Sequence, residues 1–161
     1  MCGKWGWLAG LFLSCLIALV DQITKLAVVE YLSTSDVIEV IPGFFNLILT
    51  YNPGVAFGLM ADLEWAYRQI FLTLTAVIAV GIVFYFFFFE YRRDPWARAS
   101  LASIFGGALG NIIDRVRLGE VIDFLDFYLG SYHWPAFNVA DSAICIGVVV
   151  LIFRVPRKSG A

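Results

Sequence analysis

Charged residues are scarce in this chain, and most of what remains is apolar. Only 15% of its 161 residues are charged, whereas 61% are hydrophobic and 17% are aromatic. Ordinary soluble domains are about 25% charged, and a small domain cannot hide this much apolar surface in its interior. The composition excludes a disordered chain, a collagen and a soluble two-domain enzyme, and the mean hydropathy of +0.84 predicts a membrane protein.

Cysteine and histidine are also rare. The three cysteines, Cys2, Cys15 and Cys145, form no closely spaced pair, which indicates neither a disulfide framework nor a thiolate metal site. One histidine, His133, excludes a site built from several histidines, and its aromatic neighbours favour a polar residue at the membrane interface over a catalyst. A net charge of −2 predicts no nucleic-acid partner. We therefore expect chemistry based on carboxylates, amides and a few basic residues, with no metal and no cofactor.

Four apolar segments are long enough to cross a membrane as helices. A span needs roughly 20 residues, because a helix rises about 1.5 Å per residue through about 30 Å of hydrocarbon. We predict one domain, residues 1–161, with spans at about 5–29, 69–89, 96–114 and 137–154. A secretory signal peptide is the alternative for the first span, because Lys4 precedes it, but no small-residue cleavage site follows.

Basic residues cluster on one side of the predicted membrane. Seven of the eleven lie in the N-terminal region, in the loop 90–98 or in the C-terminal tail: Lys4, Arg92, Arg93, Arg98, Arg154, Arg157 and Lys158. Short cytoplasmic segments are enriched in Lys and Arg. Both termini are therefore predicted to be cytoplasmic, as an even number of spans requires.

The segment between the first two spans has the pattern of a small sheet. Residues 36–51 are rich in Val, Ile, Phe, Leu and Tyr, and Pro42-Gly43 interrupts them, which indicates two short strands joined by a turn. Residues 62–68 are predicted as a short interfacial helix with aromatic side chains at headgroup depth. The predicted fold class is an all-α membrane protein with four transmembrane helices, a small extracytoplasmic β structure and a short interfacial helix.

Polar residues gather at the outer ends of three predicted spans. They are Asp21, Lys25, Asn111, Asp114, Arg115, Asn138 and Asp141. Within each span they recur three or four positions apart and so share a helix face. Ionisable residues inside spans are costly and mark function or a buried pair. Together with a loop that carries Asp123 and Asp126, they predict a polar cup near the outer face.

Structural interpretations compete with functional ones at several of these positions. For Asp21 and Lys25 we favour a salt bridge at the helix end, with contact between Lys25 and a substrate as the alternative. For Asp114 and Arg115 we favour a pair that braces the third helix. Close helix packing is sufficient to explain the small residues of 106–110.

The segment Asn52-Pro53-Gly54 has two interpretations of equal weight. It is either a turn that leads out of the second strand, or a segment that places the amide of Asn52 in the polar cup. The residues alone leave this choice open.

Carboxylates that meet in a shielded site predict a particular chemistry. Two such groups cannot both ionise, so they share a proton, and one activates water while the other polarises a carbonyl. The residues leave the pair open between Asp123 with Asp141 and Asp114 with Asp141. The competing classes are a small four-helix proton-coupled transporter, whose site would lie near the bilayer midplane, and a non-catalytic assembly factor.

Five motifs occur in a specific order along the chain. They are Asp21-Gln22-Ile23-Thr24-Lys25, Asn52-Pro53-Gly54-Val55-Ala56-Phe57, Gly106 to Arg115, Val121-Ile122-Asp123-Phe124, and Phe137-Asn138-Val139-Ala140-Asp141. The whole chain thereby resembles the lipoprotein signal peptidases, also called type II or prolipoprotein signal peptidases. The resemblance implies an aspartic endopeptidase of the bacterial inner membrane with a periplasmic β-cradle. It implies cleavage of prolipoproteins just before a Cys that carries diacylglycerol.

The resemblance also implies roles for single residues. Asp123 and Asp141 fall on the catalytic aspartates, near the periplasmic face. Positions that bind substrate or support the pair are Asp21, Lys25, Asn52, Gly54, Asn111, Asp114, Arg115 and Asn138. The implied partners are lipidated signal peptides and membrane lipids, without metal, cofactor or nucleic acid, and a monomer suffices. Two departures, Val55 where many members have Ala and a variable loop between Asp123 and Asp141, touch no catalytic position.

Overall fold

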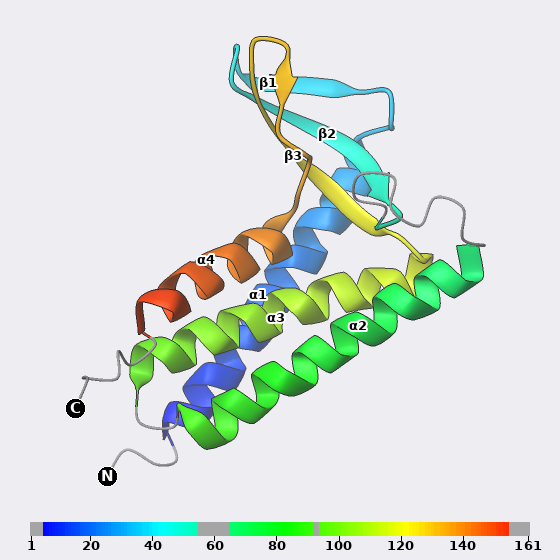
Figure 1. Cartoon of the computed structure of the whole chain (residues 1–161). Coiled ribbons are helices and arrows are strands. Elements are labelled where there is room, and N and C mark those ends of the chain that lie inside the picture. Colours follow the sequence, from blue (N-terminus) through cyan, green and yellow to red (C-terminus); the bar gives the residue numbers. More distant parts are fainter. Residues whose placement is uncertain (1–4, 55–64, 92–93, 155–161) are drawn as a thin grey trace.

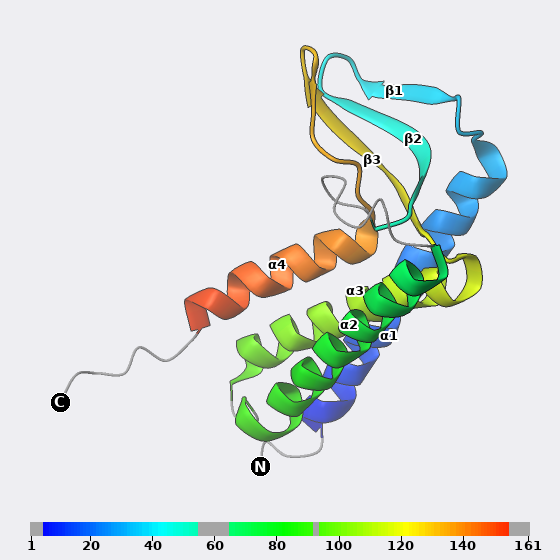
Figure 2. The same cartoon turned by 45° about the vertical axis from the view of Figure 1, so that its right-hand side comes forward.

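The computed structural model describes residues 5–54, 65–91 and 94–154. Its helices are α1 (Trp5–Tyr31), α2 (Trp65–Tyr85), α3 (Pro95–Leu118) and α4 (Val139–Arg154), and a π-helical turn, η2 (Phe86–Glu90), extends α2. Its strands are β1 (Val37–Ile41), β2 (Phe45–Asn52), β3 (Val121–Leu129) and β4 (Tyr132–His133). The sheet projects beyond one end of the helices, and α1 begins and α4 ends at the opposite end (Figures 1 and 2).

Two of the helices are long and apolar enough to cross a membrane. Within the described residues these are Trp7–Tyr31 of α1, with a mean hydropathy of 1.8, and Gln69–Phe89 of α2 and η2, with 2.5. Their large apolar side chains are mostly exposed, as expected for helices that face lipid. α3 carries many small and polar residues and α4 has only 16 residues, so membrane crossing by α3 and α4 stays a prediction.

The expected interfacial helix at 62–68 is not a separate element in the part that the structure describes. Residues 62–64 lie outside the described residues, and Trp65 begins the continuous helix α2. Tyr67 therefore belongs to the first turn of the same helix that carries the second apolar run.

α3 is the central helix, since it contacts α1, α2 and α4, whereas α2 and α4 make no contact within the described residues. Its glycines explain how closely it packs. A Cβ on Gly106 would lie 2.6 Å from the carbonyl oxygen of Ser14 in α1, and one on Gly107 would overlap the carbonyl oxygen of Ala140 in α4. The packing interpretation of these glycines is therefore confirmed.

The ends of α3 are defined by local chemistry. Asp94 caps its start, because the Asp94 Oδ1 accepts hydrogen bonds from the backbone N–H groups of Trp96 and Ala97 at 2.9 and 3.1 Å. Gly119 ends it with a φ of +78°, a left-handed conformation that glycine adopts without a Cβ clash. The chain then turns sharply into β3, which starts beside the end of α3.

The sheet has the strand order β1-β2-β3-β4 and is antiparallel. β1 and β2 form the predicted hairpin around Pro42-Gly43, where Gly43 has a φ of +75°. The prediction that Asp123 and Asp126 lie in a loop was wrong, because both residues lie in β3, at the centre of the sheet. The acidic residues interrupt the apolar pattern typical of a strand, but their buried carboxylates are hydrogen-bonded to neighbouring side chains.

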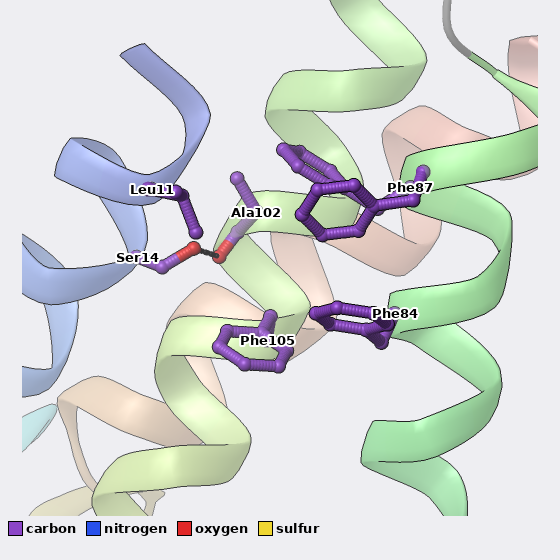
Figure 3. Close-up of a pocket in the computed structure, with 7 residues that line it drawn as sticks. Leu11, Ser14, Phe84, Phe87, Ala102 and Phe105 are labelled. Atoms are coloured by element: carbon purple, nitrogen blue, oxygen red, sulfur yellow. Dashed lines mark hydrogen bonds between the residues drawn. The ribbon is translucent and has the colours of Figure 1, made fainter. Parts of the chain in front are cut away.

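A small apolar pocket lies among α1, α3 and the α2–η2 helix (Figure 3). The rings of Phe84, Phe87 and Phe105 surround it, and the Ser14 Oγ donates a hydrogen bond to the Ala102 carbonyl at 2.8 Å beside them. Its volume of about 10 Å³ is about that needed for one water. The pocket is therefore a packing defect rather than a substrate site.

We predict that Gly107→Ala lowers the free energy of unfolding by about 1–3 kcal/mol, because the added methyl group pushes α4 away from α3. The matched control is Gly81→Ala in α2, where a Cβ meets nothing within 4 Å. Alanine favours a helix over glycine, so this control should be neutral or stabilising. Thermal unfolding in detergent measures both, and an equal response of the two variants would contradict the packing role.

Candidate active site

A buried ammonium group joins α1 to α3. The Lys25 Nζ lies 2.8 Å from the Asp21 Oδ2 and 2.7 Å from the Asp114 Oδ2, and it donates to the Asn111 Oδ1 at 3.0 Å. The side chains of Lys25, Asp21 and Asp114 are at most 1% exposed. An ammonium has three N–H donors, so its hydrogen-bonding capacity is fully used. The predicted salt bridge between Asp21 and Lys25 is present.

The prediction that Asp114 and Arg115 form a pair that braces the third helix was wrong. Asp114 pairs with Lys25, and it also accepts from the Gln22 Nε2 at 2.9 Å and from the Ile122 backbone N–H at 3.2 Å. Adjacent residues of a helix face different directions, so Arg115 lies half-buried on another side, with no ion pair among the described residues. Asp114 thus ties α1, α3 and the start of β3 together.

Asn138 caps α4 and holds Asp141 at the same time. The Asn138 Oδ1 accepts from the Asp141 backbone N–H at 2.9 Å, and the Asn138 backbone N–H donates to the Asp141 Oδ2 at 3.4 Å. This reciprocal arrangement is a capping box. The Asn111 Nδ2 donates to the other oxygen, Asp141 Oδ1, at 2.7 Å. Asp141 is half-buried in the first turn of α4 and is held through both oxygens.

Asp123 lies on β3 and is 1% exposed. Its Oδ1 accepts from the Asn138 Nδ2 at 2.7 Å, and its Oδ2 accepts from the Asn52 Nδ2 at 2.9 Å. Burial raises the pKa of Asp123 to about 6, the Asn52 hydrogen bond opposes that rise, and the carboxylate of Asp141 adds to it. Asp123 is therefore a carboxyl that holds a proton in a range where an exposed Asp does not.

The segment Asn52-Pro53-Gly54 combines the two interpretations that the residues left open. It is a turn, since Gly54 has a φ of +78° and its backbone N–H donates to the Asn52 Oδ1 at 2.8 Å. The same turn orients the amide of Asn52, whose Nδ2 donates to Asp123. An amide and a glycine at this spacing thus serve one purpose, the support of a buried carboxylate.

One residue, Asn138, therefore bonds to both carboxylates, through its side chain to Asp123 and through its backbone N–H to Asp141. Asn138 donates to Asp123 and brackets Asp141, while Asp114 is neutralised by Lys25. Of the two pairs that the residues left open, the geometry favours Asp123 with Asp141. Among the residues that the structure describes, no group of three or more His, Cys, Asp or Glu could hold a metal ion.

An open groove of about 410 Å³ begins at Asp123 and follows β3 to the loop at Trp134. The site also contains polar residues that the sequence reasoning did not assign a role. Gln22 bonds to Asp21, Asp114 and the Gly110 carbonyl, and its position inside the Asp21–Lys25 motif was a signal for this. Asp126 pairs with His133 at 2.8 Å along the same groove.

Comparison with known proteins agrees with this geometry. The family model described as "Signal peptidase (SPase) II" matches residues 13–156. The "Lipoprotein signal peptidase" of Syntrophus aciditrophicus is 43% identical over 89% of each chain, and that of Geobacter sulfurreducens is 50% identical over 86% of this chain and 85% of its own. A solved "Bacterial membrane enzyme structure by the in meso method at 1.9 A resolution" has a TM-score of 0.87 and 31% identity over 99% of both chains.

We predict that Lys25→Met is strongly destabilising, by about 3–5 kcal/mol, because it leaves the carboxylates of Asp21 and Asp114 buried without a counter-charge. Thermal or denaturant unfolding in detergent measures the loss. Adding Asp114→Asn should restore part of the stability, since one of the two unpaired charges is then removed.

The matched control for this prediction is Arg117→Met, which removes an exposed cation from the same end of α3. An exposed charge contributes little to stability, so this variant should unfold within about 1 kcal/mol of the unmodified protein. Equal losses in the two variants would refute the special role of the buried ammonium.

The raised pKa of Asp123 predicts a pH-dependent stability. Because its folded pKa of about 6 lies above the ordinary 3.8, its stabilising contribution is complete below pH 3.8 and is lost as the pH rises through about 6. The loss amounts to about 3 kcal/mol. The free energy of unfolding should therefore fall between pH 4 and 7 relative to that of Asp123→Asn. A difference that does not change with pH would contradict this.

Proposed function

The chain belongs to the signal peptidase II family of peptidases, and from that premise we propose that it is an aspartic endopeptidase that removes signal peptides from prolipoproteins. The cut falls just before the Cys that carries diacylglycerol. The observation that carries this proposal is that Asn138 bonds to both carboxylates, through its Nδ2 to Asp123 and through its backbone N–H to Asp141, beside an open groove that Asp123 lines.

The pair supplies the catalysis. Asp123 and Asp141 share one proton, since two carboxylates in a shielded site do not both ionise. The ionised member takes a proton from a water molecule, which attacks the scissile carbonyl carbon. The protonated member donates a hydrogen bond to the carbonyl oxygen, where negative charge develops. Collapse of the tetrahedral intermediate breaks the C–N bond, and the leaving nitrogen receives a proton from the pair.

The remaining polar residues of the site hold this pair or the substrate. Asn52 and Asn111 each donate to one of the two carboxylates, and Gly54 allows the turn that orients Asn52. The Asp21–Lys25–Asp114 group fixes α1 against α3. Arg115, whose charge interacts with both Asp123 and Asp141, contacts the substrate.

The proposed setting is the bacterial inner membrane, with α1, the α2–η2 helix, α3 and α4 as four spans of one domain that works as a monomer. α1 begins and α4 ends at the end of the bundle far from the sheet (Figure 1). Arg98 in the first turn of α3 and Arg154 in the last turn of α4 lie near that end, which supports a cytoplasmic location for both termini. The sheet and the acidic pair then lie at the periplasmic face. There the pair meets water while the acyl chains of the substrate stay in hydrocarbon.

A small proton-coupled transporter is not favoured. Its acidic site would lie near the bilayer midplane, whereas Asp123 lies in β3, and the sheet stands at one end of the helix bundle (Figure 2). Membership in a peptidase family also disfavours transport.

We predict that Asp123→Asn and Asp141→Asn each reduce cleavage of a diacylglyceryl-modified prolipoprotein peptide by more than about 1,000-fold, because either change removes the shared proton arrangement. Purified protein in detergent and separation of the cut peptide by mass spectrometry measure the rate. Both variants should keep a cooperative thermal transition.

The matched control is Asp36→Asn, which changes an exposed carboxylate ahead of β1 and should leave the rate unaltered. Near-normal cleavage by either catalytic-pair variant would refute the assignment of the pair. Failure of the unmodified protein to cut the peptide would refute the function itself.

A further inference from the structure

Asp126 and His133 form a second polar cluster beside the proposed catalytic pair. The His133 Nδ1 lies 2.8 Å from the Asp126 Oδ1 and 3.0 Å from the Asp126 Oδ2. The Asn46 Nδ2 donates to the Asp126 Oδ2 at 2.9 Å. Asp126 is 5% exposed, whereas the side chain of His133 is 51% exposed. A buried, fully hydrogen-bonded carboxylate thus holds an accessible imidazole.

The imidazole ring is held in one orientation, and one of its two nitrogens, Nε2, is left available for a hydrogen bond. It stacks on the ring of Tyr128 with the ring centroids 5.0 Å apart and the planes at 9°. The hydroxyl of Tyr128 is itself held by Glu39 at 2.8 Å. Since the carboxylate of Asp126 accepts a hydrogen bond from the Nδ1–H, the Nε2 of a neutral ring carries no proton and is left as an acceptor. No residue that the structure describes bonds to this Nε2.

A bulge in β3 brings Asp123 and Asp126 to the same groove. Residues three positions apart on a regular strand point to opposite faces. Here the consecutive backbone N–H groups of Phe124 and Leu125 both donate to the Phe137 carbonyl, at 3.0 and 2.8 Å, which is the pattern of a bulge. Asp123, Asp126 and His133 consequently all line the groove of about 410 Å³, a volume within the range of ligand sites.

The direction of β3 decides which part of a substrate reaches this cluster. β3 leaves the end of α3 and runs away from the helices (Figure 2), so Asp126 lies farther from the helices than Asp123. The signal segment of a prolipoprotein is apolar and stays in the bilayer, while the segment after the lipidated Cys continues into water. Three residues of extended chain span about 10 Å. The cluster therefore lies about three residues beyond a scissile bond at Asp123.

We propose that His133, oriented by Asp126, binds the backbone of the substrate segment that follows the scissile bond, by accepting a peptide N–H at its Nε2. This inference rests on the proposed function and adds a substrate-binding site to it. Binding at this site requires that the polypeptide after the lipidated Cys is long enough and extended. It does not depend on the lipid or on the signal segment.

The test compares two lipidated peptides, one that ends in an amide at the lipidated Cys and one that continues for about six residues. We expect His133→Ala to raise KM for the long peptide about three- to tenfold, the value of one neutral hydrogen bond. The kcat for the long peptide, and both constants for the short one, should not change. Asp126→Asn should give the same pattern, and the double variant should be no worse than either single one.

The matched control is Tyr132→Ala, which removes the neighbouring exposed side chain of β4 and should leave both peptides unaffected. An equal effect of His133→Ala on the two peptides, or an effect on kcat, would show a merely structural role and overturn the inference. If the unmodified protein cuts both peptides with the same KM, the inference fails while the proposed function stands. Cleavage of neither peptide would instead overturn the proposed function and this inference together.

Discussion

The rest of the site depends on a single ammonium group held out of water. Moving an unpaired charge into a low-dielectric interior is very costly, so Lys25 requires Asp21, Asp114 and Asn111 at hydrogen-bonding distance. These partners lie on α1 and α3, so only one axial register of the two helices is acceptable. The contact also decides which way the amide of Asn111 faces. With its oxygen on Lys25, its nitrogen must point at Asp141.

This electrostatic requirement is met because α3 has glycines where α1 and α4 pack against it. A Cβ on Gly110 would overlap the carboxylate of Asp21, so the glycine is what lets a charged side chain of α1 fit against the backbone of α3. The same carboxylate also accepts from the Ala140 backbone N–H at 2.9 Å, which orients the start of α4. The small residues of α3 thus allow the close approach that the buried charges require.

Much of the fold followed from apolar run length and turn chemistry. The helix ranges, the hairpin around Pro42-Gly43 and the packing role of the glycines could be predicted, because each depends on local sequence. β3 could not be predicted, since Asp123 and Asp126 interrupt the apolar pattern of a strand. The side chains that stabilise these carboxylates include Asn46 and Asn52, which lie about 70 to 80 positions earlier in the sequence. For the same reason Asp114 was given the wrong partner. Neighbours in sequence suggested Arg115, but the counter-charge comes from another helix.

The capping box at Asn138 has a consequence for how the protein loses activity. Asn138, which caps the start of α4, also bonds to both carboxylates. Fraying of the first turn of this helix would therefore separate Asp123 from Asp141. Helix ends open far more often than whole molecules unfold. We therefore expect the stability of the site to depend on a single helical turn, so that heating abolishes activity before the helix bundle unfolds.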